Sequence, residues 1–331
     1  MCSGKRVDMS TGMGRVLAVV AIAWSIWLAG PLAGQQDQAG RPSVSTPTFK
    51  SGVDMVTLNA VVKDRNGRLV TSLTRESFAL IDDGKPRPIL DFRPDSAPIT
   101  AALLIDSSGS MQVADNVENA RKAAGLILAQ LDPASDEVAV FTFDTEFKEL
   151  RGFAAHGGGL QDLLGEMHPF GMTSLYDAIA VTARRVAARG RFHRAVIVLT
   201  DGIDTASALT APEVSGIASS IDVPIYIVAV TSPLDHPGGP DAVKSSRNSP
   251  LAGELVDLAR WTGGELFVSS QPSHMYLAAR QIVSELRHQY LIAFEPDSRP
   301  GWHPLELRVR DRNLSVRARG GYFAARPRQG S

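Results

Sequence analysis

Residues 101–110 read AALLIDSSGS, so an apolar run ends at an acidic residue and continues into hydroxyl side chains. Five consecutive apolar residues are typical of a strand that is buried on both faces of a parallel sheet. Three more runs of this kind follow along the chain, at residues 138–143, 195–199 and 225–230. Their repetition predicts a Rossmann-like, doubly wound α/β domain with a mainly parallel sheet.

Amphipathic stretches lie between and after these runs, with the apolar spacing of helices that cover a sheet. We expect helices near residues 117–131, 175–188, 213–220, 251–261 and 273–287. The predicted α/β domain therefore spans residues 98–287.

Short segments of alternating apolar and polar residues flank this region on both sides. Val56, Leu58 and Ala60 alternate with polar residues, and Asn66-Gly67 offers a hairpin turn. Residues 305–309 and 314–318 alternate in the same way, with a turn at 311–313 between them.

Neither flank has enough strands to bury a sheet face alone. We therefore expect residues 51–97 and 288–325 to form one small β-rich accessory domain, into which the α/β domain is inserted. Residues 326–331 are left as a tail.

The first 34 residues have the features of a secretory signal peptide. Basic residues precede an apolar stretch at 16–30, and small residues follow up to Gly34. The stretch is shorter than the roughly 20 residues that span a bilayer, although an uncleaved anchor is the alternative. We expect cleavage near Gly34, a disordered polar linker at 35–50, and export to the periplasm, the cell envelope or the medium. No membrane span would then remain.

The composition of the 331-residue chain excludes several functions. Lys and Arg number 34 against 35 Asp and Glu, which removes the positive field that nonspecific nucleic-acid binding needs. Cys2 is the one cysteine, so the chain has no intramolecular disulfide and no cysteine-built zinc or iron–sulfur site.

Oxygen-bearing side chains follow the ends of the predicted strands. Asp106, Ser108 and Ser110 leave the first buried strand at positions i, i+2 and i+4, and Thr173 and Asp201 lie in later segments that reach the same edge. Ligands of doubly wound sheets bind outside the carboxyl edge. A set made only of oxygens suits a hard divalent ion such as Mg²⁺. Neutral hydroxyls would leave its charge poorly neutralised, so an incoming carboxylate could complete the shell.

The order Asp-x-Ser-x-Ser, then Thr, then Asp resembles the metal-ion-dependent adhesion site (MIDAS) of von Willebrand factor A domains. The resemblance covers about residues 98–287, and the segments 73–78, 173–179 and 319–322 resemble bacterial secreted VWFA-related proteins. It implies that the two serines and the threonine coordinate Mg²⁺, or Mn²⁺ or Ca²⁺. It also implies that the aspartates act directly or through water, and that an Asp or Glu of a partner protein fills the open position.

Simpler roles compete for several residues. Asp-x-Ser-x-Ser alone is a weak signal, because Ser and Asp commonly cap a helix start. Asp177 is expected to complement a helix dipole, with support of the site as the alternative. Asp144 and Asp204 are expected to be solvated loop acids. The seven histidines have no metal-ligand spacing and are expected to be structural or exposed. Arginines alternate through the last predicted strands and are expected on the wet face of an edge hairpin: Arg308, Arg310, Arg312, Arg317 and Arg319.

The Pro-, Gly- and Ser-rich segment 231–250 leaves the carboxyl end of a predicted strand, so we expect it to border the metal site and to shape partner choice.

We interpret the chain as a secreted, non-enzymatic, metal-dependent module for protein binding or cell adhesion. One alternative is a structural or assembly protein whose metal only stabilises the loops. Another is a metal-dependent phosphohydrolase, since a strand ending in Asp-x-Ser resembles phosphotransferases with an aspartyl nucleophile. Those enzymes carry a second Asp, their general acid–base, where Ser108 stands, and the chain has no nucleophile elbow. The sequence has no signature of a particular partner or oligomeric state.

Overall fold

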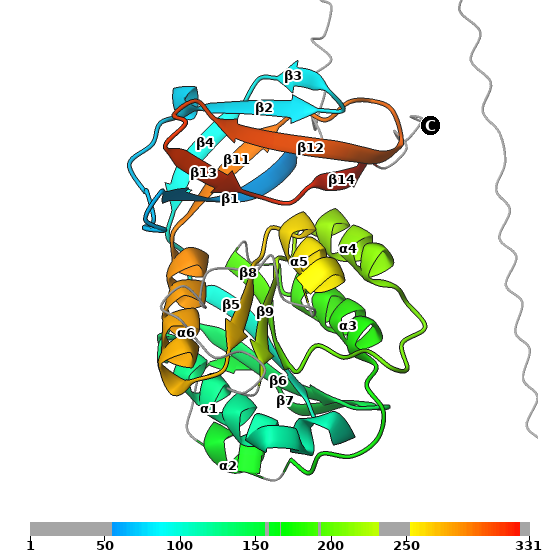
Figure 1. Ribbon diagram of the computed structural model, residues 1–331. Coiled ribbons are helices and arrows are strands. Elements are labelled where there is room, and N and C mark those ends of the chain that lie inside the picture. Colours follow the sequence, from blue (N-terminus) through cyan, green and yellow to red (C-terminus); the bar gives the residue numbers. More distant parts are fainter. Residues whose placement is uncertain (1–54, 156–158, 166, 191–192, 232–251, 325–331) are drawn as a thin grey trace, which may run out of the picture. The chain divides into compact units, whose positions relative to one another are not determined.

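The computed structural model describes residues 55–324 except 156–158, 166, 191–192 and 232–251 (Figure 1). The predicted signal peptide, linker and tail, and nearly all of the segment 231–250, lie outside the described residues. Among the helices that are described, none is both long and apolar enough to span a membrane.

The predicted mainly parallel sheet is confirmed. Its strand order is β10-β9-β8-β5-β6-β7, and every neighbouring pair is parallel except β6 and β7. The strands are β5 (Ile99–Asp106), β6 (Glu137–Phe143), β7 (Phe147–Ala155), β8 (His193–Thr200), β9 (Ile225–Val230) and β10 (Leu266–Ser269).

Helices cover both faces of this sheet, which is why β5 is a continuous apolar run (Figure 1). Leu103 and Ile105 pack on the face covered by α1 (Asn116–Leu128) and α6 (Pro272–Arg287). Ala102 and Leu104 pack on the other face, in one core with the remaining helices. These are α3 (Leu175–Ala187), α4 (Ala211–Ser220) and α5 (Ala252–Trp261).

Three elements of this domain were not predicted from the sequence: β7, β10 and α2 (Leu160–Gly165). β7 is an antiparallel edge strand with register shifts against β6, and its residues are only partly buried or exposed. β10 is fully buried but has only four residues. Neither strand has the long apolar run from which buried strands are recognised.

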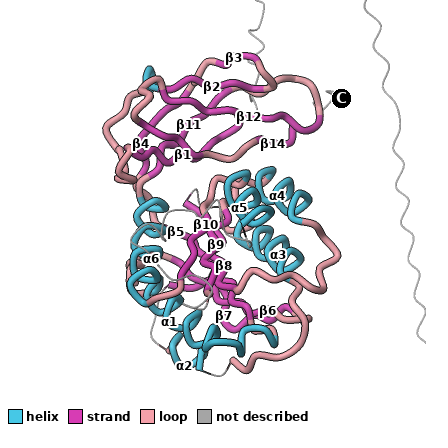
Figure 2. The backbone as a smooth tube through the Cα atoms, viewed as in Figure 1, coloured by secondary structure: helices cyan, strands magenta, loops and turns pink. Residues whose placement is uncertain are grey.

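The flanking segments form two further four-stranded sheets, with orders β13-β1-β11-β4 and β14-β12-β2-β3 (Figure 2). Strands of the N-terminal flank pair with strands of the C-terminal flank in both sheets, β1 with β11 and β2 with β12. The strands are β1 (Val56–Asp64), β2 (Phe78–Asp82), β3 (Lys85–Arg87), β4 (Asp91–Asp95), β11 (Gln289–Phe294), β12 (Gly301–Val309), β13 (Leu314–Arg317) and β14 (Gly321–Ala324).

One apolar core lies between the two β-rich sheets. Leu58, Tyr290 and Ile292 contribute to it from the first sheet, and Leu80 and Tyr322 from the second. Each flank supplies strands to both sheets, so neither flank could form this core by itself.

The expected hairpin over residues 305–318 is wrong. The turn at Asp311 exists, but it joins strands of different sheets: β12 pairs with β2 and β14, whereas β13 pairs with β1. Arg317 and Arg319 are also mostly buried, not on a wet face. Arg319 donates to the carbonyl of Ser219 at the end of α4 at 2.8 Å. Alternation reveals which residues share a face, but not what that face packs against.

A group of four charges, with Glu285 fully buried and the other three partly buried, joins the β-rich strands to the α/β domain. Lys63 Nζ lies 2.7 Å from Glu265 Oε2 and 2.5 Å from Glu285 Oε1. Arg317 forms ion pairs with the same two carboxylates. We call Lys63, Glu265, Glu285 and Arg317 the charge cluster; two positive and two negative charges balance within it.

Candidate functional site

The candidate site lies where the order of the parallel strands changes direction. β5 pairs with β6 on one side and with β8 on the other, so the loops that leave β5 and β8 diverge at its carboxyl end. Such a switch point leaves a crevice outside the strand ends, where ligands of doubly wound sheets bind. Asp106 is the last residue of β5 and stands at this point.

Asp106 is fully buried, with both carboxylate oxygens held by hydrogen bonds. Its Oδ1 accepts from the backbone N–H of Ser108 at 2.9 Å, and its Oδ2 accepts from the hydroxyl of Thr200 at 2.6 Å. Burial raises the pKa of Asp106 to about 6 although these hydrogen bonds oppose the rise, and the charge of Asp201 raises it further. Among the described residues no cation pairs with Asp106.

The two predicted serine ligands lie together directly after β5. The hydroxyl oxygens of Ser108 and Ser110 are 3.0 Å apart, at the start of the 3-10 turn Gly109–Asp115. The hydroxyl of Ser107 is directed elsewhere, since it donates to the carbonyl of Phe143 at 3.0 Å. The local chain therefore brings alternate hydroxyls to one place.

Backbone hydrogen bonds dock the Thr173 segment on this turn. Phe170 N–H donates to the carbonyl of Ser107 at 2.8 Å, and Gly109 N–H donates to the carbonyl of Gly171 at 3.0 Å. A Cβ on Gly109 would lie only 3.3 Å from that carbonyl, and Gly171 has a φ of +84°, so both positions favour glycine. Thr173 itself is buried.

Asp201 follows β8 directly and is buried, as expected for a strand-end residue. Its Oδ1 accepts from the backbone N–H of Ile203 at 3.2 Å. The same loop contacts the Thr173 segment, because the carbonyl of Thr173 accepts from the backbone of Thr205 and Ala206, both at 2.9 Å. The three predicted segments are thus linked to one another at one edge of the sheet.

Two neighbouring acids have structural partners. Asp204 is not a freely solvated loop acid: its Oδ1 accepts from Leu175 N–H, the first backbone amide of α3, at 2.8 Å. Asp177 accepts from the backbone of Ala208 and Leu209, both at 2.9 Å. Both acids therefore fix the loop between β8 and α4 against α3.

The donor set fits a hard divalent ion by its chemistry, since it comprises two carboxylates and three hydroxyls and no nitrogen or sulfur. No group of three or more Asp, Glu, His or Cys side chains with the arrangement of a metal site occurs in the described part of the chain. Any ion here would therefore depend on hydroxyl ligands.

Sequence reasoning missed Thr200, whose hydroxyl holds Asp106, and Gly171, whose carbonyl positions the serine turn. Each lies within two residues of a predicted ligand, but a buried Thr and a loop Gly have no distinctive pattern in the sequence.

Large apolar side chains stand exposed around the site. They come from the serine turn, the Thr173 segment and the loop after β8, and Phe170 is 80% exposed. We call this set the apolar rim: Val113, Phe170, Met172 and Ile203.

The sequence-family model of the von Willebrand factor type A domain matches residues 101–203. No curated protein matches the chain. Among solved structures, the conserved hypothetical protein BatB of Bacteroides thetaiotaomicron is 18% identical, over 56% of this chain and 98% of that one, with a TM-score of 0.45. A von Willebrand factor type A protein of Catenulispora acidiphila is 13% identical, over 73% and 75%, with a TM-score of 0.46.

Proposed function

Because the chain contains a von Willebrand factor type A domain over residues 101–203, we propose that it is a non-catalytic binding module that captures an acidic residue of a partner protein through a divalent ion. The ion would be held by Asp106, Ser108, Ser110, Thr173 and Asp201. The observation that carries the proposal is the juxtaposition of paired serine hydroxyls with a buried carboxylate that has no cation partner among the described residues.

The residues of the proposed site have different roles. Ser108 and Ser110 offer neutral oxygens, while Thr200 and the backbone of Ser108 fix the orientation of the Asp106 carboxylate. A bound Mg²⁺ would supply a positive charge that three neutral hydroxyls do not cancel, which leaves it open to a carboxylate ligand. The apolar rim favours a protein as the partner, since its exposed side chains could be buried by a protein surface around the charged centre.

Metal binding is tested by titrating Mg²⁺ and Mn²⁺ into the EDTA-stripped protein in a calorimeter. We expect saturable binding that is lost in a Ser108→Ala, Ser110→Ala double variant. Ser107→Ala is the matched control, because its hydroxyl is committed to the Phe143 carbonyl, and it should bind the ion like the wild type. Binding that survives in the double variant would contradict the assignment.

Carboxylate capture is tested with an acidic peptide and its amide counterpart. We expect the Asp-containing peptide to bind only with the ion present and to be released by EDTA, while the Asn-containing peptide does not bind. If Mg²⁺ only raises the melting temperature and the acidic peptide never binds, the ion serves to stabilise the loops.

We also propose that the protein is exported after cleavage near Gly34, on the strength of the basic and apolar pattern of residues 1–34. The mass and N-terminal sequence of the protein recovered from the periplasm or medium test this. A chain recovered from the membrane with residue 1 intact would instead indicate a retained anchor.

A further inference from the structure

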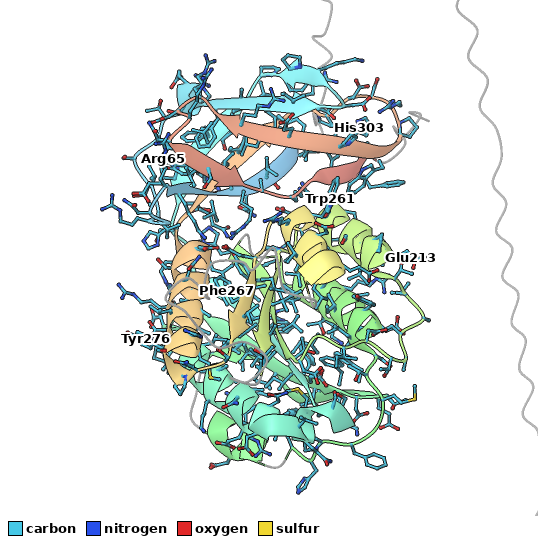
Figure 3. All side chains as sticks on the ribbon, viewed as in Figure 1. Arg65, Glu213, Trp261, Phe267, Tyr276 and His303 are labelled. Atoms are coloured by element: carbon cyan, nitrogen blue, oxygen red, sulfur yellow. The ribbon has the colours of Figure 1, made fainter. Side chains whose placement is uncertain are left out.

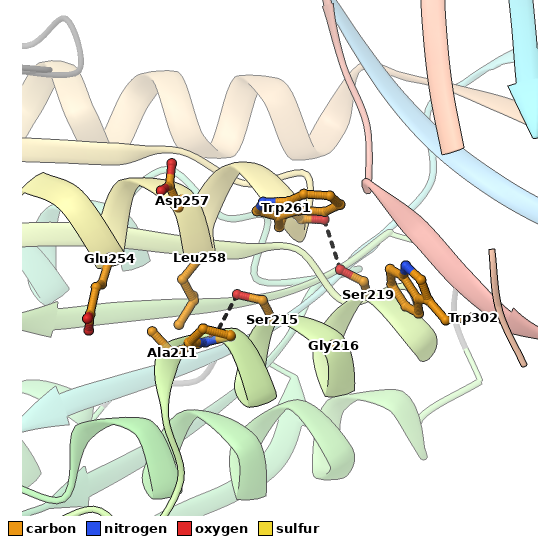
Figure 4. A pocket seen from close by; sticks show the side chains of 10 residues that line it. Ala211, Ser215, Gly216, Ser219, Glu254, Asp257, Leu258, Trp261 and Trp302 are labelled. Carbon is orange, nitrogen blue, oxygen red and sulfur yellow. Dashed lines mark hydrogen bonds between the residues drawn. The ribbon is translucent and has the colours of Figure 1, made fainter. Parts of the chain in front are cut away.

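A cavity of about 410 Å³ lies between α4, α5 and the start of β12 (Figure 4). Helix α5 lines it with Glu254, Asp257, Leu258 and Trp261, and β12 contributes Trp302. The volume lies in the range of pockets that hold small ligands or single side chains. The α/β domain and the β-rich strands therefore build this pocket together.

Two indole rings form its aromatic walls. Trp261 ends α5 beside the β-rich strands (Figure 3), and its side chain is 48% exposed; Trp302 is 37% exposed. Each ring packs on a glycine, at the residue before β14 and at the first residue of β14. A Cβ would lie 2.1 Å from the Trp261 ring at Gly320, and 2.3 Å from the Trp302 ring at Gly321. Two consecutive glycines thus allow both rings to pack on the backbone.

The backbone of Trp261 is also fixed. Its carbonyl accepts from the backbone N–H of Gly320 and from the hydroxyl of Ser219, both at 2.8 Å (Figure 4). These bonds come from the β-rich segment and from α4, so two elements besides α5 fix the backbone that carries the Trp261 ring. A preorganised wall loses little entropy when a ligand packs against it.

The pocket also carries negative charge without a matching positive one. Glu254 and Asp257 lie one turn apart on α5, and Glu254 Oε2 accepts from the hydroxyl of Tyr176 at 3.0 Å. Neither carboxylate forms an ion pair with another described residue. Indole faces attract cations, and carboxylates add a specific counter-charge. The combination calls for a ligand that is flat, apolar along its length and positively charged.

We propose that this pocket binds an arginine side chain of a partner polypeptide. A guanidinium group stacks on an indole and donates two parallel hydrogen bonds to a carboxylate, whereas an ammonium ion does neither as well. The aliphatic part of an arginine side chain suits Leu258 and the Trp rings. The pocket shares no residue with the proposed metal site, so the contact does not need the ion.

The experiment uses the full chain in EDTA, which separates this site from the metal-dependent one. Blocked tripeptides Ala-Arg-Ala, Ala-citrulline-Ala and Ala-Lys-Ala are titrated by calorimetry, with choline as a small-molecule cation. We expect saturable binding of the arginine peptide, about tenfold weaker binding of the lysine peptide, and no measurable binding of the neutral citrulline peptide.

Two variants locate the binding in the pocket. Glu254→Gln with Asp257→Asn keeps the shape of α5 and is expected to weaken arginine-peptide binding at least tenfold. Trp302→Leu keeps an apolar wall but removes the aromatic face and should weaken binding about fivefold. Asp162→Asn, at an exposed acid on α2, is the matched control and should bind like the wild type.

Four outcomes would overturn the proposal. They are equal binding of the citrulline peptide, choline binding tighter than the arginine peptide, no binding of any probe, and wild-type affinity in the Glu254→Gln, Asp257→Asn variant. A fifth concerns the chain's own arginines at 326 and 328. If alanine at both positions tightened peptide binding tenfold or more, the pocket would serve the chain's own end and not a partner.

Discussion

At Asp106, the stability of the fold and the proposed metal binding place opposite demands on the carboxylate. Its folded-state pKa is raised from 3.8 to about 6 by burial. At pH 7 the carboxylate is therefore charged and buried, which destabilises the metal-free fold. At about 1.4 kcal/mol per pH unit, Asp106→Asn is expected to stabilise the metal-free fold by up to about 3 kcal/mol. Urea unfolding in EDTA at pH 7 measures this. Because the folded-state pKa is raised, this destabilisation disappears as Asp106 becomes protonated. The unfolding free energy of the wild type should therefore approach that of the variant as the pH falls from 7 to 4.

Mg²⁺ provides the counterpart to this prediction. It should stabilise the wild type and leave Asp106→Asn unchanged, since the variant lacks the charge that the ion compensates. A metal-free Asp106→Asn protein less stable than the wild type would contradict the prediction.

Gly171 is predicted to be intolerant of a side chain. Gly171→Ala places a Cβ in a backbone with φ of +84°, about 3.0 Å from Thr145 Oγ1. We expect a loss of about 1–2 kcal/mol of unfolding free energy and weaker Mg²⁺ binding, because the Gly171 carbonyl positions the serine turn. Gly216→Ala in α4, where a Cβ meets no atom within 4 Å, is the control and should be neutral or stabilising.

At this scale, the sequence predicted which side chains reach the sheet edge but not what holds them. Asp106, Ser108 and Ser110 are revealed by their fixed spacing after an apolar run. The hydrogen bond from Thr200 to Asp106 joins residues 94 positions apart, and no local pattern specifies it.

At the scale of elements, the charge cluster links β1, β13 and α6 through ion pairs. Removing one member leaves an uncompensated buried charge, which is more destabilising than loss of an exposed pair. Arg317→Met is therefore expected to lower the unfolding free energy by about 3–5 kcal/mol. Arg308→Met, at a side chain 61% exposed and paired with Glu306, should change it by less than about 1 kcal/mol. Chemical denaturation of both variants measures the two changes in unfolding free energy. Equal changes would contradict the view that the charge cluster stabilises the fold more than an exposed ion pair does.

The cluster also makes stability depend on pH. Burial alone would raise the pKa of Glu285, but the charges of Arg317 and Lys63 lower it below its ordinary value. A depressed folded-state pKa contributes stability that is present above the unfolded value of about 4.3 and lost as the pH falls below it. We expect the difference in unfolding free energy between wild type and Glu285→Gln to be largest near pH 7 and to decrease between pH 4.5 and 2. A gap independent of pH would contradict this.

The wrong expectation for residues 305–318 has a physical cause at the same scale. A short turn between two alternating strands favours a hairpin, but here β12 pairs with β2 and β13 pairs with β1, so the two strands belong to different sheets. The partners, β1 and β2, lie more than 200 residues earlier, beyond the reach of any local signal.

For the whole molecule, the alternation of β5, β6, β8 and β9 with helices was predictable because these buried strands are mainly apolar. The division into an α/β domain and a discontinuous β-rich domain stays a prediction about folding units. We expect flanks cut free by protease sites placed after residues 97 and 287 to co-purify, since β1 with β11 and β2 with β12 pair across the cuts. Separation of the two flank fragments on a sizing column would indicate that they do not fold as one unit.

The placement of β5 has a mechanical consequence. The β-rich strands join the α/β domain at the amino end of β5, after β4, while the candidate site lies at its carboxyl end. A tensile load between a ligand held at the site and an anchor on the β-rich strands therefore runs lengthwise along β5. Ladders to β6 and β8 flank this strand on both sides, so the load would act in shear, and many hydrogen bonds would have to break together before the strand slipped.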